Sequence, residues 1–170
     1  MRKVLCGFVL LGLLSVAPLA NAAEMKFGYF DLQRIMYDSQ RGKKEWDVLA
    51  KRGAELEKVF VRKRDELKAL GAELSKKDSL LNEQVRRNKE KDYQLKAKDL
   101  ERLQSDAKTE LGQMRQDIMN RLGRLLNKVI TKMGDEEKYT LLLDIGMIAY
   151  APKELDITDK VIKAFDAAKE

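Results

Sequence analysis

Residues 41–133 decide the fold of this chain, and they read RGKKEWDVLAKRGAELEKVFVRKRDELKALGAELSKKDSLLNEQVRRNKEKDYQLKAKDLERLQSDAKTELGQMRQDIMNRLGRLLNKVITKM. The stretch contains no proline and repeats its apolar residues at helical spacing almost throughout. Helices of globular proteins average about 11–12 residues, so a run of this length predicts a coiled coil, a helical hairpin or a helical array.

Charge separates this rod from the rest of the chain. Residues 41–133 carry 25 Lys and Arg against 16 Asp and Glu, whereas residues 23–40 and 134–170 together carry 7 basic and 12 acidic residues. A basic rod attached to an acidic body is more typical of a holding or bridging protein than of an enzyme.

The rod is predicted to fold back on itself as an arm. Its apolar positions step by three and four from Leu56 and again from Leu100 to Met133, but residues 82–92 hold one apolar residue in eleven. We therefore place the tip of an antiparallel two-helix hairpin near 82–92, with helices of about 45 residues and roughly 65 Å each. The alternative is one continuous helix in a parallel coiled coil, because no proline or glycine forces the turn.

Both ends of the chain contribute to a small β body, residues 23–40 and 134–170. We expect a strand at residues 26–32, a helix at 33–39, and an end to the rod at Gly134 and residues 135–137. Residues 139–143 are apolar and predict a buried strand, and residues 144–146 a turn that leads into a return strand at 147–150. Ile157 is expected to add a short edge strand, and Thr158 to cap a last helix. The predicted fold class is α+β, mostly α, with three or four strands and the arm inserted between them.

The body has few residues from which to build an independent hydrophobic core. About 55 residues outside the rod is a marginal number for an independent core, and oligomerisation is the usual remedy. Subunits that pair strand edges would complete a sheet or small barrel. We expect Trp46 to pack where the arm meets the body. The residues expected in the oligomer core are Phe27, Tyr29, Leu141, Leu143, Ile148 and Tyr150.

Residues 1–22 are predicted to be a secretory signal peptide. Arg2 and Lys3 precede an apolar run from Val4 to Val16, and residues 20–22 form an Ala-Asn-Ala cleavage site. An uncleaved membrane anchor is the alternative, but the run is too short to span comfortably. We expect export to the periplasm with cleavage after about Ala22.

Side-chain chemistry argues against catalysis. The sequence has no histidine, and its one cysteine, Cys6, lies in the predicted signal peptide. The commonest general base, metal ligand and thiol nucleophile are thereby missing from the mature chain. No phosphate-binding glycine loop and no G-x-S-x-G motif is present. We expect no enzyme activity, no cofactor and no metal.

Two ends of the chain carry a resemblance to a known family. The first strand running into Phe30-Asp31-Leu32-Gln33-Arg34-Ile35, the basic coiled coil, residues 139–144 (YTLLLD), and Ile148-Ala149-Tyr150 followed by Leu155-Asp156-Ile157-Thr158-Asp159 are similar to the OmpH/Skp family of periplasmic chaperones. The resemblance implies a homotrimer in which the β bodies form the core and three helical hairpins enclose a basic cavity. It also implies a holdase that binds unfolded outer-membrane proteins without ATP.

Basic clusters along the arm are the candidate contacts for clients or lipids. Positive arms attract acidic clients at long range, and a basic tip suits anionic head groups; the plainer interpretation of the tip is a solvated turn. We expect no physiological nucleic-acid partner, although phosphate neutralisation alone gives adventitious binding. A structural envelope spacer and an anionic-surface (lipopolysaccharide, phospholipid) binding protein are the alternative functions. The candidate residues are Arg62, Lys63, Arg64, Lys76, Lys77, Arg86, Arg87, Lys89 and Lys91.

Four glycines interrupt the predicted arm helices. Each costs a helix up to about 1 kcal/mol relative to alanine. The glycines are either tolerated without a role or used for close helix–helix packing, or they make compliant arms that can spread around clients. The four are Gly53, Gly71, Gly112 and Gly123.

Overall fold

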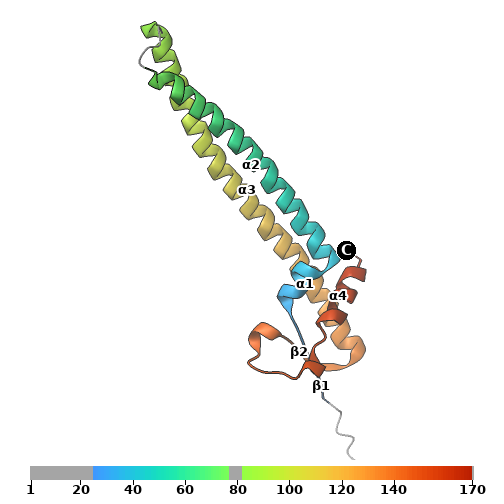
Figure 1. Cartoon of the computed structure of the whole chain (residues 1–170). Helices are drawn as coiled ribbons and strands as arrows, with labels where there is room; N and C mark the ends of the chain where they lie inside the picture. The colour runs from blue at the N-terminus through green and yellow to red at the C-terminus, as the bar shows by residue number, and fades with distance from the viewer. Residues whose placement is uncertain (1–24, 77–81, 170) are drawn as a thin grey trace, which may run out of the picture.

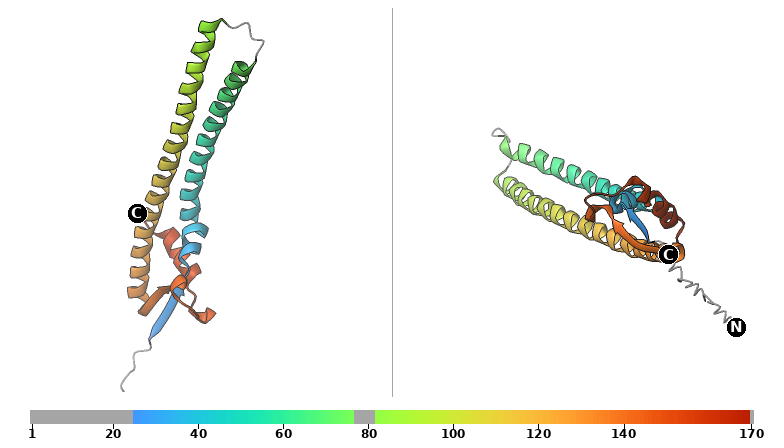
Figure 2. Two further views of the ribbon diagram at one scale, coloured as in Figure 1. Left: turned by 90° about the vertical axis from the view of Figure 1, so that its left-hand side faces the viewer. Right: turned by 90° about the horizontal axis from the view of Figure 1, so that it is seen from below.

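The arm is a hairpin of two long helices that lie side by side. The computed structural model describes residues 25–76 and 82–169, so the predicted signal peptide with its cleavage site and Lys77 lie outside the described residues. Helix α2 spans Gln40–Ser75 and α3 spans Glu83–Glu137. They run antiparallel from the body to a common tip (Figures 1 and 2). This confirms the hairpin and excludes the continuous helix.

The turn lies earlier in the sequence than predicted. Residues 83–92, expected to form the tip, are the first turns of α3, and the chain reverses between Ser75 and Glu83. Asn82 caps α3, because its side chain accepts a hydrogen bond from the Gln84 backbone N–H at 3.0 Å. The prediction relied on polar composition, but Glu, Gln, Lys and Arg are good helix formers. Their polarity here reflects a solvent-exposed helix.

The body contains a two-stranded parallel sheet. Strand β1 (Lys26–Phe30) pairs with β2 (Tyr139–Asp144), with Gly28 opposite Leu142 and Phe30 opposite Asp144. Parallel strands need a long crossover connection between them. Helix α1 (Leu32–Asp38) and the whole arm supply that connection here.

The predicted return strand at residues 147–150 is wrong, and so is the hairpin that would contain it. Ile145–Met147 forms a 3₁₀ helix, η1, and no strand follows it before a second 3₁₀ helix, η2, at Lys153–Leu155. Tight hairpin turns require residues with positive φ, and among the described residues Lys138 alone has one. The expected edge strand at Ile157 is reduced to a single bridge between Tyr29 and Asp156.

The arm helix α3 also continues beyond its predicted end. Gly134 and residues 135–137 remain helical, and Lys138 ends the helix in a left-handed conformation with φ of 60°. The Lys138 N–H donates to the Gly134 carbonyl oxygen. The left-handed cap position therefore falls four residues after the glycine that the sequence suggested.

The hydrophobic core sits where the arm meets the body. It joins one side of β1, helix α1, the last third of α3 and the C-terminal helix α4 (Thr158–Ala167). The prediction assigned residues up to 133 to the arm, but the segment of α3 from Ile118 to Met133 supplies most of this core. This explains why α3 has 55 residues against 36 in α2. The core residues are Phe30, Ile35, Met36, Ile118, Leu122, Leu125, Leu126, Val129, Met133, Val161 and Phe165.

Two polar contacts lock the body around this core. Thr158 is buried; its Oγ1 accepts from the Asp31 backbone N–H at 3.0 Å, and its own N–H donates to Asp156 Oδ1 at 2.8 Å. The sequence predicted that Thr158 caps the last helix. Instead, Thr158 is the first residue of α4, and Ile157 occupies the cap position. The packing of Trp46 at the arm–body junction is confirmed, because its Nε1 donates to the Met36 carbonyl at 2.9 Å and its ring stacks on Tyr37.

Candidate functional site

Between the body and the tip, the two arm helices do not enclose a fully buried hydrophobic core. No side chain in residues 43–75 of α2 or 83–117 of α3 is fully buried. The seam residues, such as Leu56, Phe60 and Leu111, are only half-buried. Two helices cover only one side of each other, so the edges of each apolar stripe face solvent. Further exposed apolar side chains on the arm are Val48, Val85, Tyr93, Leu95 and Met119.

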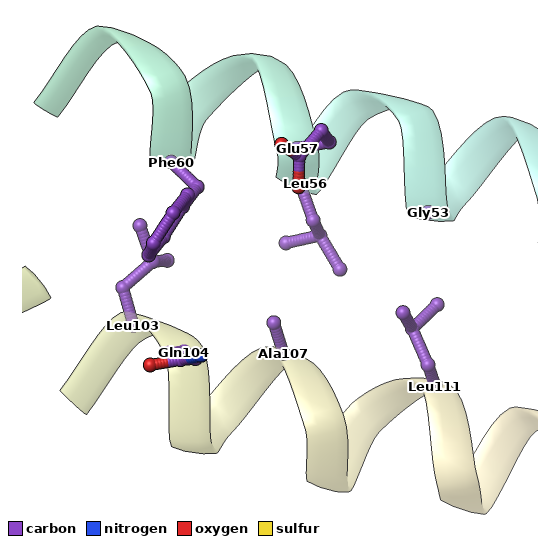
Figure 3. A pocket seen from close by; sticks show the side chains of 8 residues that line it. All are labelled: Gly53, Leu56, Glu57, Phe60, Leu103, Gln104, Ala107 and Leu111. Atoms are coloured by element: carbon purple, nitrogen blue, oxygen red, sulfur yellow. The ribbon is translucent and has the colours of Figure 1, made fainter. Parts of the chain in front are cut away.

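The seam contains a hollow of about 150 Å³ halfway along the arm (Figure 3). Small residues make the room: Gly53 faces Leu111, and Ala107 faces Leu56 (Figure 3). A Cβ added at Gly53 would lie 4.0 Å from the Leu111 side chain, which leaves space between the helices. Near the tip, by contrast, a Cβ at Gly71 would lie 3.2 Å from the Tyr93 ring, so there glycine serves close packing. Whether the glycines make the arm compliant stays a prediction.

Ion pairs across the seam hold the two helices in register. Arg52 of α2 donates to both carboxylate oxygens of Glu110 on α3, at 2.6 and 3.2 Å. Further cross-seam pairs join Glu45 with Arg121 at 2.6 Å, Glu66 with Lys96 at 3.5 Å, and Glu73 with Lys89. Exposed pairs of this kind contribute little stability each. Their spacing along the arm is what opposes a slip of one helix past the other.

These pairs shift the ionisation of their carboxylates. The hydrogen bond from Arg52 lowers the pKa of Glu110, and the hydrogen bond from Lys89 lowers the pKa of Glu73. In the body, Lys160 and then Lys26 do the same to the pKa of Glu137, against the opposing effect of burial. Glu137 thereby links β1, the end of α3 and α4.

The predicted basic residues line the arm without converging on one site. Arg62, Lys63 and Arg64 lie exposed on α2, with Arg64 3.4 Å from Asp65, and Lys76 is exposed at the end of that helix. Lys91 is exposed on α3.

At the tip, three of the predicted cations are already paired. Arg86 contacts Glu90 at 3.1 Å, Arg87 lies 4.0 Å from Glu83, and Lys89 contacts Glu73 on the other helix. The two pairs within α3 have the i,i+4 spacing that the sequence displays, so the sequence itself argues against a free basic tip.

The residues predicted for an oligomer core have mixed surroundings within one protomer. Phe27 and Leu141 are register partners on adjacent strands, and both are about half-exposed; Tyr150 is 85% exposed. Leu143 and Ile148 are partly buried, whereas Tyr29 is buried inside the protomer.

Two further apolar side chains of the body are exposed and were not predicted. Met25 is 68% and Met147 is 79% exposed. We refer to these two residues with Phe27, Leu141 and Tyr150 as the exposed apolar set of the body, and apolar surface left uncovered in a soluble protein is a candidate interaction surface.

Two kinds of feature are not found among the described residues. Within residues 25–76 and 82–169, no helix combines the length and apolar character needed to cross a membrane. In the same residues no three acidic, histidine or cysteine side chains gather as metal ligands would.

Comparison with known proteins gives a consistent result. Residues 26–165 match the family described as outer membrane protein (OmpH-like). The fold is similar to the 2.83 Å crystal structure of an OmpH-like protein from Caulobacter crescentus CB15, a proposed outer membrane chaperone. The two share 23% identity with a TM-score of 0.76, over 85% of this chain and 86% of the other. No curated protein matches the sequence.

Proposed function

The chain belongs to the OmpH-like family of outer membrane proteins, and on this premise we propose that it is a periplasmic chaperone that holds unfolded outer-membrane proteins between basic helical arms, without ATP. The family is not one of enzymes. The exported, cleaved chain would assemble as a homotrimer through the exposed apolar set of the body, and the arms of its three copies would surround the client.

The observation that carries this proposal is the absence of a fully buried side chain in residues 43–75 and 83–117. A surface of half-covered Leu, Val and Met side chains offers many weak apolar contacts that adapt to different partners. Unfolded outer-membrane strands alternate apolar and polar residues and aggregate readily. A client held by many weak contacts is shielded from other copies and still released to a better site in the membrane.

Electrostatic attraction acts over longer distances than these apolar contacts. The exposed cations of the arm, including Arg62 and Lys63, attract acidic segments before apolar contact is made, and this attraction falls with added salt. A rigid envelope spacer is the competing function. It is disfavoured because a spacer gains from a tightly packed seam, whereas this seam is hollow at Gly53 and Ala107.

The test measures client solubility. A urea-unfolded outer-membrane barrel protein is diluted into buffer with the chain starting at Ala23, and light scattering follows both aggregation and the mass of the complex. We expect a defined, soluble complex with the wild type. Replacing Val48, Leu95 and Met119 by serine should leave the chain folded with unchanged helical circular dichroism, because none of the three belongs to the buried core, and should allow the client to aggregate.

The matched control introduces serine at three exposed arm positions without removing large apolar surface: Ala54, Gln94 and Gln113. This variant should hold the client as well as the wild type. A wild-type oligomer that leaves the client to aggregate would support the spacer function and refute the holdase.

A further inference from the structure

A basic hollow lies at the root of the arm, far along the hairpin from the predicted tip clusters. It measures about 180 Å³, and its lining includes the side chains of Arg41, Arg121, Arg124 and Lys128 against a single carboxylate, Glu45. Arg121, Arg124 and Lys128 project from one face of α3, because their spacing of three and four residues matches the helical repeat. Arg41 enters from the first turn of α2.

Two of these arginines are held in place by the body and the arm. Arg121 Nη2 donates to Glu45 Oε2 at 2.6 Å, and Arg41 Nη2 donates to the Ala168 carbonyl at 2.6 Å. The hollow also contacts Leu122 and Leu125, which belong to the buried core. This apolar floor lowers the local dielectric and strengthens attraction between the cations and an anion.

The other two cations have no acidic partner within the described residues. Arg124 and Lys128 are exposed and take part in none of the ion pairs found in residues 25–76 and 82–169. This differs from the tip, where Arg86, Arg87 and Lys89 each have a carboxylate partner. The hollow at the root of the arm therefore contains two cations without a carboxylate partner among the described residues.

We propose that this hollow binds a phosphate group. The guanidinium of Arg124 and the ammonium of Lys128, which have no carboxylate partner among the described residues, suit an anion at this place, and the planar guanidinium of arginine presents paired donors that match phosphate oxygens. The volume admits a phosphate but not a folded domain. The phosphate can be free in solution or part of a lipid head group that reaches the arm root. The proposal goes beyond the holding of clients, because it requires no unfolded protein.

Binding of inorganic phosphate to the chain from Ala23 tests the proposal by titration calorimetry at constant ionic strength, with phosphorus NMR line broadening as a second readout. We expect saturable binding with one phosphate per chain. The double substitution Arg124→Gln with Lys128→Gln should weaken it by at least about tenfold. The control, Arg62→Gln with Lys63→Gln, removes the same net charge from exposed positions of α2 outside this hollow and should leave the affinity unchanged.

A second arm of the experiment separates the two sources of phosphate. Cosedimentation with phosphatidylcholine vesicles that contain phosphatidic acid, compared with phosphatidylcholine alone, reports on head groups. Vesicle binding that the Arg124/Lys128 pair of substitutions reduces assigns the hollow to lipid phosphate, and phosphate binding without vesicle binding assigns it to soluble phosphate. Equal weakening by both double variants, no saturable phosphate binding, or binding of an acidic peptide in place of phosphate would overturn the proposal.

Discussion

At the scale of single residues, Gly42 is the position least tolerant of a side chain. It lies in the first turn of α2 where α1 ends, and its N–H donates to the Ser39 hydroxyl at 3.0 Å. A Cβ at this position would lie 2.1 Å from the Met36 carbonyl oxygen, so backbone would have to move. We expect Gly42→Ala to destabilise the fold by roughly 1–3 kcal/mol or more, measured as a lower urea midpoint of unfolding.

Gly112 is the matched control, because it lies in α3 and a Cβ there would meet nothing within 4 Å. Gly112→Ala should instead stabilise the chain by up to about 1 kcal/mol. An unchanged midpoint for Gly42→Ala would contradict the close approach of α1 and α2.

Residue-scale prediction from the sequence succeeded where a local pattern carries the information. Helical spacing predicted the apolar seam that contains Leu56 and Leu111, and the single tryptophan near the start of the rod, Trp46, was correctly placed at the junction. Gly42 and the basic hollow were not predictable in this way. Both depend on distances between segments far apart in the sequence, such as Arg41 against Ala168, which no spacing rule contains.

At the scale of elements, the cross-seam ion pairs make the arm sensitive to acid. The pKa values of Glu73 and Glu110 lie below the ordinary value of 4.5 when the chain is folded. Their contribution to stability is therefore complete above about pH 4.5 and is lost as the pH falls through the lowered values. We expect Glu110→Gln to lower the melting temperature slightly at neutral pH, by a difference that shrinks as the pH falls below 4.5. Circular dichroism melts across this range measure the difference, and an equal gap at both ends would contradict the pairing.

Among the elements, helices were predicted well and strands partly. The long helices are dictated by a repeat that persists over many turns, and β1 and β2 by short apolar runs. The turn was misplaced because residues 83–92 are polar helix formers. The return strand was wrong because apolar residues at 147–150 suggest a strand only if Gly146 adopts a hairpin turn, and its φ is not positive.

At the scale of the whole molecule, the exposed apolar set on the body predicts assembly. Leu141 is 46% and Tyr150 is 85% exposed in the single chain, so serine at both positions should leave the protomer folded. We expect the proposed trimer to dissociate, with roughly a threefold fall in the mass from light scattering and unchanged helical circular dichroism. Met119→Ser, on the arm, is the control that should keep the trimer mass. A double variant that keeps the full oligomer mass would place the interface elsewhere.

The parallel pairing of β1 with β2 also determines when the sheet can form during synthesis of the chain. Lys26 and Thr140, whose backbone and side chain are hydrogen-bonded, stand 114 positions apart. Strand β1 is synthesised early, but its partner β2 is synthesised only after almost all of the intervening chain. The arm forms from local contacts and brings the two strands together, so the loss of chain entropy on closing this long connection is modest. Until residue 144 has been synthesised, the nascent chain contains an apolar strand without its pairing partner. During that interval it exposes an unpaired apolar strand, as do the unfolded proteins that folded copies of this chain are proposed to hold.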